Sequence, residues 1–167
     1  PLFKLFKKEK FMKIKCLFLL LSLTSALASA NTEIPKELTN LIPVGSNSFQ
    51  VIGQTADGDQ CRVMLSNSVF GFGAEILIED EHGDLDSRRL GKFQIGLGHQ
   101  LTGPVKKSSN TISATSYHRA EESYSSDTRS TLTISAKDGV IELIKIKSEK
   151  KFLFLFRTDV NETCYLQ

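Results

Sequence analysis

The sequence predicts a mainly β, antiparallel domain. From about residue 48 on, apolar residues recur with a period of two, which is the alternation expected of a strand with one buried face. Turn pairs such as Asp57-Gly58 and Asp138-Gly139 interrupt this alternation at short intervals, as β-hairpins require. Helical signals are confined to Pro35–Leu41, where two turns are expected before Pro43 and Gly45 end them. We therefore expect a short N-terminal helix followed by strands.

Eight strands are expected, joined mainly by short polar turns. Their expected ranges are 49–53, 61–66, 74–80, 92–97, 111–118, 130–136, 140–147 and 152–158. Residues 148–151 are expected to form the turn before the last strand. That strand is apolar on both faces, because three phenylalanines alternate with two leucines over 152–156. The pattern indicates a strand that is central in the sheet or covered on both sides.

These strands predict an antiparallel meander, for which two architectures are possible. A small closed barrel, of lipocalin-like size, removes the exposed sheet edges and is the favoured arrangement. A two-layer sandwich, in which two inner faces pack together, is the alternative. A barrel of eight strands holds either a filled core or one small ligand, and both cases remain open. No motif in the chain is specific enough to indicate a family.

Residues 12–30 have the three parts of a secretory signal peptide. Met12–Lys15 is a basic start, Cys16–Ala28 is an apolar run, and Ala28-Ser29-Ala30 supplies the small residues of a cleavage site. The apolar run is shorter than the roughly 20 residues of a membrane-spanning helix, so no transmembrane segment is expected in the mature protein. Residues 1–11 are expected to be an upstream over-extension of the reading frame, with a longer basic leader as the alternative. The sequence thus predicts export to a periplasm or to the extracellular space.

Removal of this leader changes the charge of the chain. Residues 1–30 contain six of the 21 Lys and Arg and one of the 19 Asp and Glu, which leaves 15 basic and 18 acidic residues and a formal charge of −3. Nucleic-acid binding needs a clustered positive footprint and is therefore not expected. The rest of the chain suits a lead-in with the short helix over 31–47 and a single β-domain over 48–167.

Cleavage would also leave two of the three cysteines, Cys61 and Cys164. An even number of cysteines in an exported chain predicts a disulfide, because the compartment is oxidising. The two cysteines lack the short spacing of a zinc site, so no metal is expected there. The bridge should tie the C-terminal tail to the first hairpin, which brings the two ends of the β-domain together as barrel closure requires.

Three groups of polar residues are candidates for chemistry, and each has a simpler interpretation. The acidic run 79–86 offers oxygen ligands but lacks the spacing of a calcium loop, so a solvated turn without metal is expected. The histidines His82, His99 and His118 show neither zinc spacing nor a nucleophile motif and are expected at the surface. A basic run crosses the last hairpin; it could attract an anionic partner or a membrane surface, but such lysines more often protect an exposed strand. This run consists of Lys145, Lys147, Lys150 and Lys151.

These observations predict a binding protein that is not an enzyme and has no cofactor. The expected partner is an unknown small apolar molecule within a barrel, or a protein that contacts the loops. One alternative is a secreted hydrolase that uses His99 or His118 with a nearby acid. Another is an envelope structural protein, or an inhibitor, acting through the loops 98–110 and 119–128. A central cavity favours the ligand, a histidine against a carboxylate favours the enzyme, and a filled core with projecting loops favours the protein partner.

Overall fold

The computed structural model describes residues 33–80, 82–86, 89–120 and 126–166. The predicted extension over 1–11 and the predicted signal peptide over 12–30 lie outside the described residues. All the elements below belong to one compact unit. Within the described ranges, no helix has both the length and the apolar composition needed to cross a bilayer.

Ten strands and one very short helix make up the described part of the chain, which confirms the mainly β, antiparallel prediction. The helix, α2 (Lys36–Thr39), is the predicted N-terminal helix and is shorter than the two turns expected. Two strands more than expected form within the loop 98–110. The strands are β1 (Ser48–Gln54), β2 (Gln60–Ser68), β3 (Gly71–Ile78), β4 (Gly91–Ile95), β5 (His99–Leu101), β6 (Lys106–Lys107), β7 (Thr111–His118), β8 (Thr128–Lys137), β9 (Val140–Phe152) and β10 (Leu155–Leu166).

All ten strands belong to one antiparallel sheet that is not closed, so the favoured barrel is wrong. The strand order is β4-β3-β2-β1-β10-β9-β8-β7-β5, with β6 paired to β7. Between β4 and β5 there is a tight turn with the isolated bridge Gly96↔His99 in place of a ladder. At the edge of β4, the Ser148 hydroxyl of β9 donates a hydrogen bond to the Lys92 carbonyl oxygen at 3.2 Å. A side chain, and not a partner strand, therefore satisfies that edge carbonyl.

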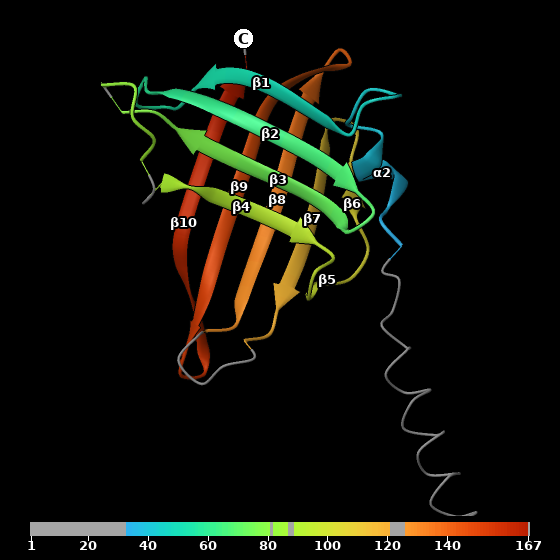
Figure 1. Cartoon of the computed structure of the whole chain (residues 1–167), viewed down its shortest axis with the longest axis vertical. Helices are drawn as coiled ribbons and strands as arrows, with labels where there is room; N and C mark the ends of the chain where they lie inside the picture. Colours follow the sequence, from blue (N-terminus) through green and yellow to red (C-terminus); the bar gives the residue numbers. More distant parts are fainter. Residues whose placement is uncertain (1–32, 81, 87–88, 121–125, 167) are drawn as a thin grey trace, which may run out of the picture. The chain divides into compact units, whose positions relative to one another are not determined.

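The sheet folds over so that its two halves face each other, with β1–β4 crossing β7–β10 (Figure 1). A Cβ atom added to Gly91 of β4 would lie only 3.2 Å from the Cβ atom of Ile146 on β9. This close approach shows that the two halves pack directly against each other. The arrangement has the paired inner faces of the predicted sandwich, although both layers belong to one continuous sheet.

The hydrophobic core lies between these inner faces. Buried positions alternate with more exposed ones along β2, β3 and β4, as a period of two requires. The rings of Phe72 and Phe93 meet edge to face, with their centroids 6.4 Å apart. Leu38 of α2 is also fully buried in this core. The other large, fully buried side chains are Leu65, Ile76, Ile78, Ile95, Leu132, Ile144, Ile146 and Val63.

The two halves are joined by a short seam between β1 and β10. Among the described residues, the strands pair at two positions, Gly53↔Leu166 and Gln54↔Tyr165. The predicted disulfide between Cys61 and Cys164 lies at this seam, with a Cα–Cα distance of 5.9 Å and both residues fully buried. The bond therefore ties the first hairpin to the C-terminal strand, as predicted, but it joins two halves of an open sheet and does not close a barrel.

The last hairpin differs from the prediction. β9 continues through 148–151, where the turn was expected, and the actual turn is Leu153-Phe154. The four residues at its tip are exposed instead of covered: Phe152 is 58% exposed, Leu153 75%, Phe154 93% and Leu155 68%. Turns are recognised in a sequence by Gly, Pro, Asn and Asp, so a turn made of two apolar residues cannot be recognised in this way.

Candidate functional site

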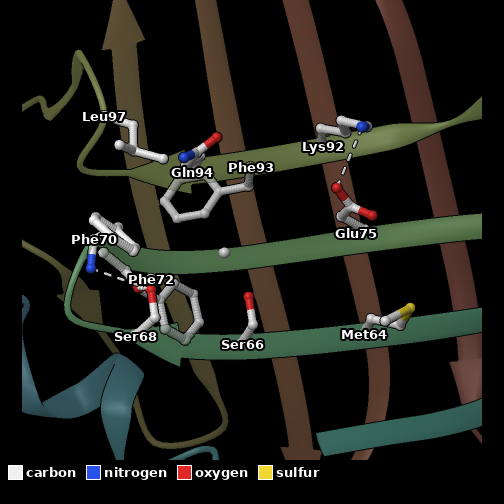
Figure 2. Close-up of a pocket in the computed structure, with 12 residues that line it drawn as sticks. Met64, Ser66, Ser68, Phe70, Phe72, Glu75, Lys92, Phe93, Gln94 and Leu97 are labelled. Atoms are coloured by element: carbon white, nitrogen blue, oxygen red, sulfur yellow. Dashed lines mark hydrogen bonds and ion pairs between the residues drawn. The ribbon is translucent and has the colours of Figure 1, made fainter. Parts of the chain in front are cut away.

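A groove lies on the outer face of β2, β3 and β4, on the side of these strands away from the core (Figure 2). Its volume is about 310 Å³, and it is open to solvent. Outward-pointing residues of the three strands form its floor, and the turns that follow β2 and β4 form its rim at one end. The groove is lined by Met64, Ser66, Ser68, Phe70, Gly71, Phe72, Gly73, Glu75, Lys92, Phe93, Gln94 and Leu97.

Gly73 forms part of the floor, and the fold does not require a glycine there. It lies within β3, between Ser66 of β2 and Gln94 of β4. An added Cβ atom would meet only the Ser66 hydroxyl at 3.0 Å and the Phe93 carbonyl oxygen at 4.0 Å, and the hydroxyl can rotate away. A glycine weakens a strand, and it is typical of places where a ligand or another backbone approaches closely. The absent side chain keeps the groove open.

The neighbouring glycine, Gly71, has a structural role instead. Its φ of +140° is unfavourable for other residues, and an added Cβ atom would collide with the carbonyl oxygen of Ile95. A side chain at position 71 would therefore disrupt the pairing of β3 with β4. Of the two glycines in the floor, only Gly73 is left without a structural explanation.

Two exposed apolar side chains stand at the rim. Phe70 and Leu97 are each 66% exposed, and they come from the turns after β2 and β4. The Ser68 hydroxyl accepts a hydrogen bond from the Phe70 amide at 3.2 Å, which holds the first turn. Leu97 was expected to continue the fourth strand, but the strand ends at Ile95 and Leu97 has a φ of +51°. Leucine in this left-handed region costs about 1–2 kcal/mol, and such strain is typical of functional positions.

The other end of the groove is polar. The Lys92 ammonium lies 3.3 Å from the Glu75 carboxylate, and both side chains are well exposed. An exposed ion pair of this kind contributes only about 0–1 kcal/mol to stability. Met64, next to it on β2, is partly exposed as well. The groove thus runs from an apolar rim at one end to a charged wall at the other.

In the acidic run 79–86, the described residues around Asp80 form a turn, and Asp80 and Glu79 bind protein groups. The Asp80 carboxylate accepts hydrogen bonds from the backbone amides of His82 at 2.8 Å and Asp84 at 3.0 Å, which is the Asx geometry of a tight turn. Glu79 forms an ion pair with Arg62 at 2.7 Å. Among the described residues, no three His, Cys, Asp or Glu side chains gather as they would around a metal ion.

The structure brings two of the three histidines together. His99 of β5 pairs with His118 of β7, and their rings stack with centroids 4.5 Å apart. Burial lowers the pKa of His99, and the neighbouring His118 lowers it further by charge repulsion. No carboxylate among the described residues forms a hydrogen bond or ion pair with either ring.

We expect the lowered pKa of His99 to make the fold less stable in mild acid. Because the folded state holds His99 neutral, its contribution is complete above the unfolded value of about 6.5 and is lost as the pH falls through the lower folded value. The acids Asp127 and Glu149 also have lowered pKa values, but they ordinarily titrate near 4, so their losses come at lower pH. Urea unfolding from pH 7 to pH 5 should show declining stability, and His99→Gln should flatten that decline. An unchanged slope in the variant would assign the effect to other groups.

The predicted basic run is largely engaged with acids. Lys147 and Arg129 bind the Glu149 carboxylate at 2.8 Å and 2.9 Å, and these contacts hold the pKa of Glu149 below its ordinary value, the Lys147 hydrogen bond being the largest cause. Lys150 lies 3.0 Å from Asp159 and Lys151 lies 3.2 Å from Asp127. Lys145 lines a second open depression on the outer face of β8 and β9.

Sequence reasoning did not identify the groove. The signal for it was the segment 69–73, in which two glycines alternate with two phenylalanines at the start of a strand. Such glycines are ordinarily assigned to a turn or a bulge, and the assignment is correct for Gly71 alone. Comparison with known proteins gives no further assignment, since no family model, curated protein or solved structure matches this chain.

Proposed function

We propose that this protein is an exported binding protein that holds a protein partner in the groove over β2, β3 and β4. The observation that carries the proposal is Gly73, a strand glycine that the fold does not need, placed in the floor of an outer-face groove. The exposed Phe70 and Leu97 at the rim support it, because buried apolar anchors supply most of the affinity of protein interfaces.

The open shape of the groove favours a protein partner over a small molecule. Small-molecule sites enclose most of the surface of their ligand, whereas this groove is open along one side. A protein partner brings its own surface and can cover that side. An apolar side chain of the partner would lie over Gly73 between Phe70 and Leu97. The hydroxyl of Ser66 is placed to bind a polar group beside it.

The disulfide is compatible with the exported location in this proposal. Disulfides persist in oxidising compartments and are rare in the cytosol. The signal-peptide pattern at residues 12–30 supports the same location. A periplasmic or extracellular partner follows from the two observations together.

The proposal is tested by filling the groove. Gly73→Val should keep the fold, with thermal stability unchanged or raised, because valine favours strands and Ser66 can rotate aside. A random peptide library displayed on phage is selected on the native protein, and the selected peptides are then measured on the variant. We expect their affinity to fall at least about tenfold, since the added side chain excludes an anchor worth about 1.5–3 kcal/mol.

The matched control is Gln50→Val, which adds a valine at an exposed position of β1 outside the groove. This variant should bind the selected peptides as the native protein does. Peptides that bind all three proteins equally, or a selection that enriches none, would contradict the proposal.

A further inference from the structure

The β9–β10 hairpin ends in an apolar tip that projects beyond the other described strands. Residues 152–155 are consecutive apolar side chains, each more than half exposed. The neighbouring strand β8 pairs with β9 only as far as Thr128↔Lys150, so the described ladder between β8 and β9 ends before the tip. Figure 1 shows the hairpin extending past the crossing strands at the end of the sheet opposite β1. None of these four side chains belongs to the hydrophobic core that the described residues form.

The backbone of the tip also opposes its sequence. Leu153 has a φ of +55°, in the left-handed region where a two-residue hairpin turn prefers glycine. A bulky residue there is a genuine outlier. Leu153 is therefore unfavourable at the tip in two ways, because it exposes an apolar side chain and because its backbone conformation is one that leucine rarely adopts. A residue retained under both costs indicates a role other than folding.

Cations stand directly behind the apolar tip. The positions that follow Phe152↔Leu155 along the hairpin include Lys151 and the cross-strand pair Lys150↔Arg157. The Arg157 guanidinium lies over the Phe152 ring at 4.9 Å, and it has no carboxylate partner among the described residues. Residues 150–159 contain three cations and the single acid Asp159, and Asp127, which precedes β8, pairs with Lys151 at 3.2 Å.

We propose that this tip inserts into the surface of an anionic lipid bilayer. The partner is inferred from the distance between the apolar and the basic residues along the hairpin. The pair Lys150↔Arg157 lies two residues behind the pair Phe152↔Leu155, which is about 7 Å along a strand. Apolar groups that bind membrane surfaces enter to a depth of about 5–10 Å, with basic residues left at the phosphate groups. When the tip is inserted, Lys150, Lys151 and Arg157 therefore lie at the level of the lipid phosphates. A pocket in a protein would not require this separation of apolar and basic residues by depth.

Two contacts fit this binding mode. Exposed ion pairs such as Lys150–Asp159 are worth little, so the ammonium can exchange its carboxylate for a lipid phosphate at low cost. Arg157 is held beside the tip by its ring contact and not by an acid, so its guanidinium remains available. This surface lies on a different hairpin from the groove, and the proposal does not depend on the groove having a partner.

A single tryptophan provides the test, because the sequence contains none. The full chain carrying Phe154→Trp is mixed with vesicles of equimolar phosphatidylglycerol and phosphatidylcholine, and with vesicles of phosphatidylcholine alone. We expect the emission to shift to the blue and to be quenched by brominated lipid. The affinity should be at least about tenfold higher with the anionic vesicles at low salt, since each basic residue near such a surface adds about 1 kcal/mol. Phe70→Trp, at the groove, should show neither change.

A second variant separates folding from membrane binding. Leu153→Gly combined with Phe154→Ser gives the turn the residues it prefers, so its thermal stability should match or exceed that of the native protein. Its sedimentation with anionic vesicles should weaken about ten- to hundredfold through the loss of two apolar side chains. All variants share residues 1–32, so any contribution of that segment cancels. An unshifted emission at position 154, equal binding to neutral vesicles, or undiminished sedimentation of the turn variant would each overturn the proposal.

Discussion

Replacing Cys61 and Cys164 together with serine is expected to lower the free energy of unfolding by about 2–5 kcal/mol. The bond joins residues that are 103 positions apart, and a loop of about 100 residues gives an upper estimate near 4.7 kcal/mol from chain entropy. Both sulfur atoms lie in the core, so the loss should not be recovered by solvation. The bond also supports a seam of two described residue pairs. Urea unfolding of the native and variant proteins measures the difference.

A matched variant separates the cross-link from the polarity of serine. The double replacement by alanine removes the bond without burying two hydroxyls, so it should be destabilised by the loss of the cross-link alone. Peptide mapping without reductant should recover Cys61 and Cys164 as one linked pair. Equal unfolding midpoints for the native protein with and without reductant, when the reduction is verified by maleimide labelling, would show that the bond contributes nothing.

Phe72→Ala is expected to cost about 3–5 kcal/mol, the usual range for removing a buried aromatic ring. Phe72 is fully buried, and its ring meets Phe93 edge to face beneath the groove. Truncation removes the transfer free energy of the ring and leaves a cavity that strands paired on both sides cannot easily fill. Urea unfolding of the purified variant provides the measurement.

Phe70→Ala is the matched control for this prediction. The same residue type lies two positions earlier and is 66% exposed, so its truncation should change stability by no more than about 0.5 kcal/mol. Comparable losses from the two variants would mean that Phe72 does not lie in the core. Together the two variants separate the buried and exposed faces of one short segment.

Much of the fold could be predicted because it depends on local alternation. β7 was expected over 111–118 and forms over the same residues, since Ile112 and Ala114 alternate with polar residues at its start. The disulfide could be predicted from the number of cysteines and the expected compartment, without knowledge of the strand order. The strand can be predicted from the residues within it, and the disulfide can be predicted from the number of cysteines in the chain.

The features that could not be predicted depend on which strands meet. A run that is apolar on both faces suits a doubly covered strand and also an exposed tip, and only the pairing of Phe152 with Leu155 decides between them. The choice between a barrel and an open sheet depends on the edge of β4, where the Ser148 hydroxyl takes the place of a strand. The groove depends on three strands whose order in the sheet is not encoded by any one of them.

The seam between β1 and β10 has a consequence for the making of the protein. A chain emerges from its N-terminus, so β1–β4 are complete long before the strand that carries Cys164. At about 5–20 residues per second, the 103 residues that follow Cys61 up to and including Cys164 take about 5–20 s to synthesise. During that interval the Cys61 thiol is unpaired and the apolar inner face of the first four strands is uncovered. We therefore expect aggregation and the pairing of Cys61 with a foreign thiol to compete with folding until β9 and β10 have been made.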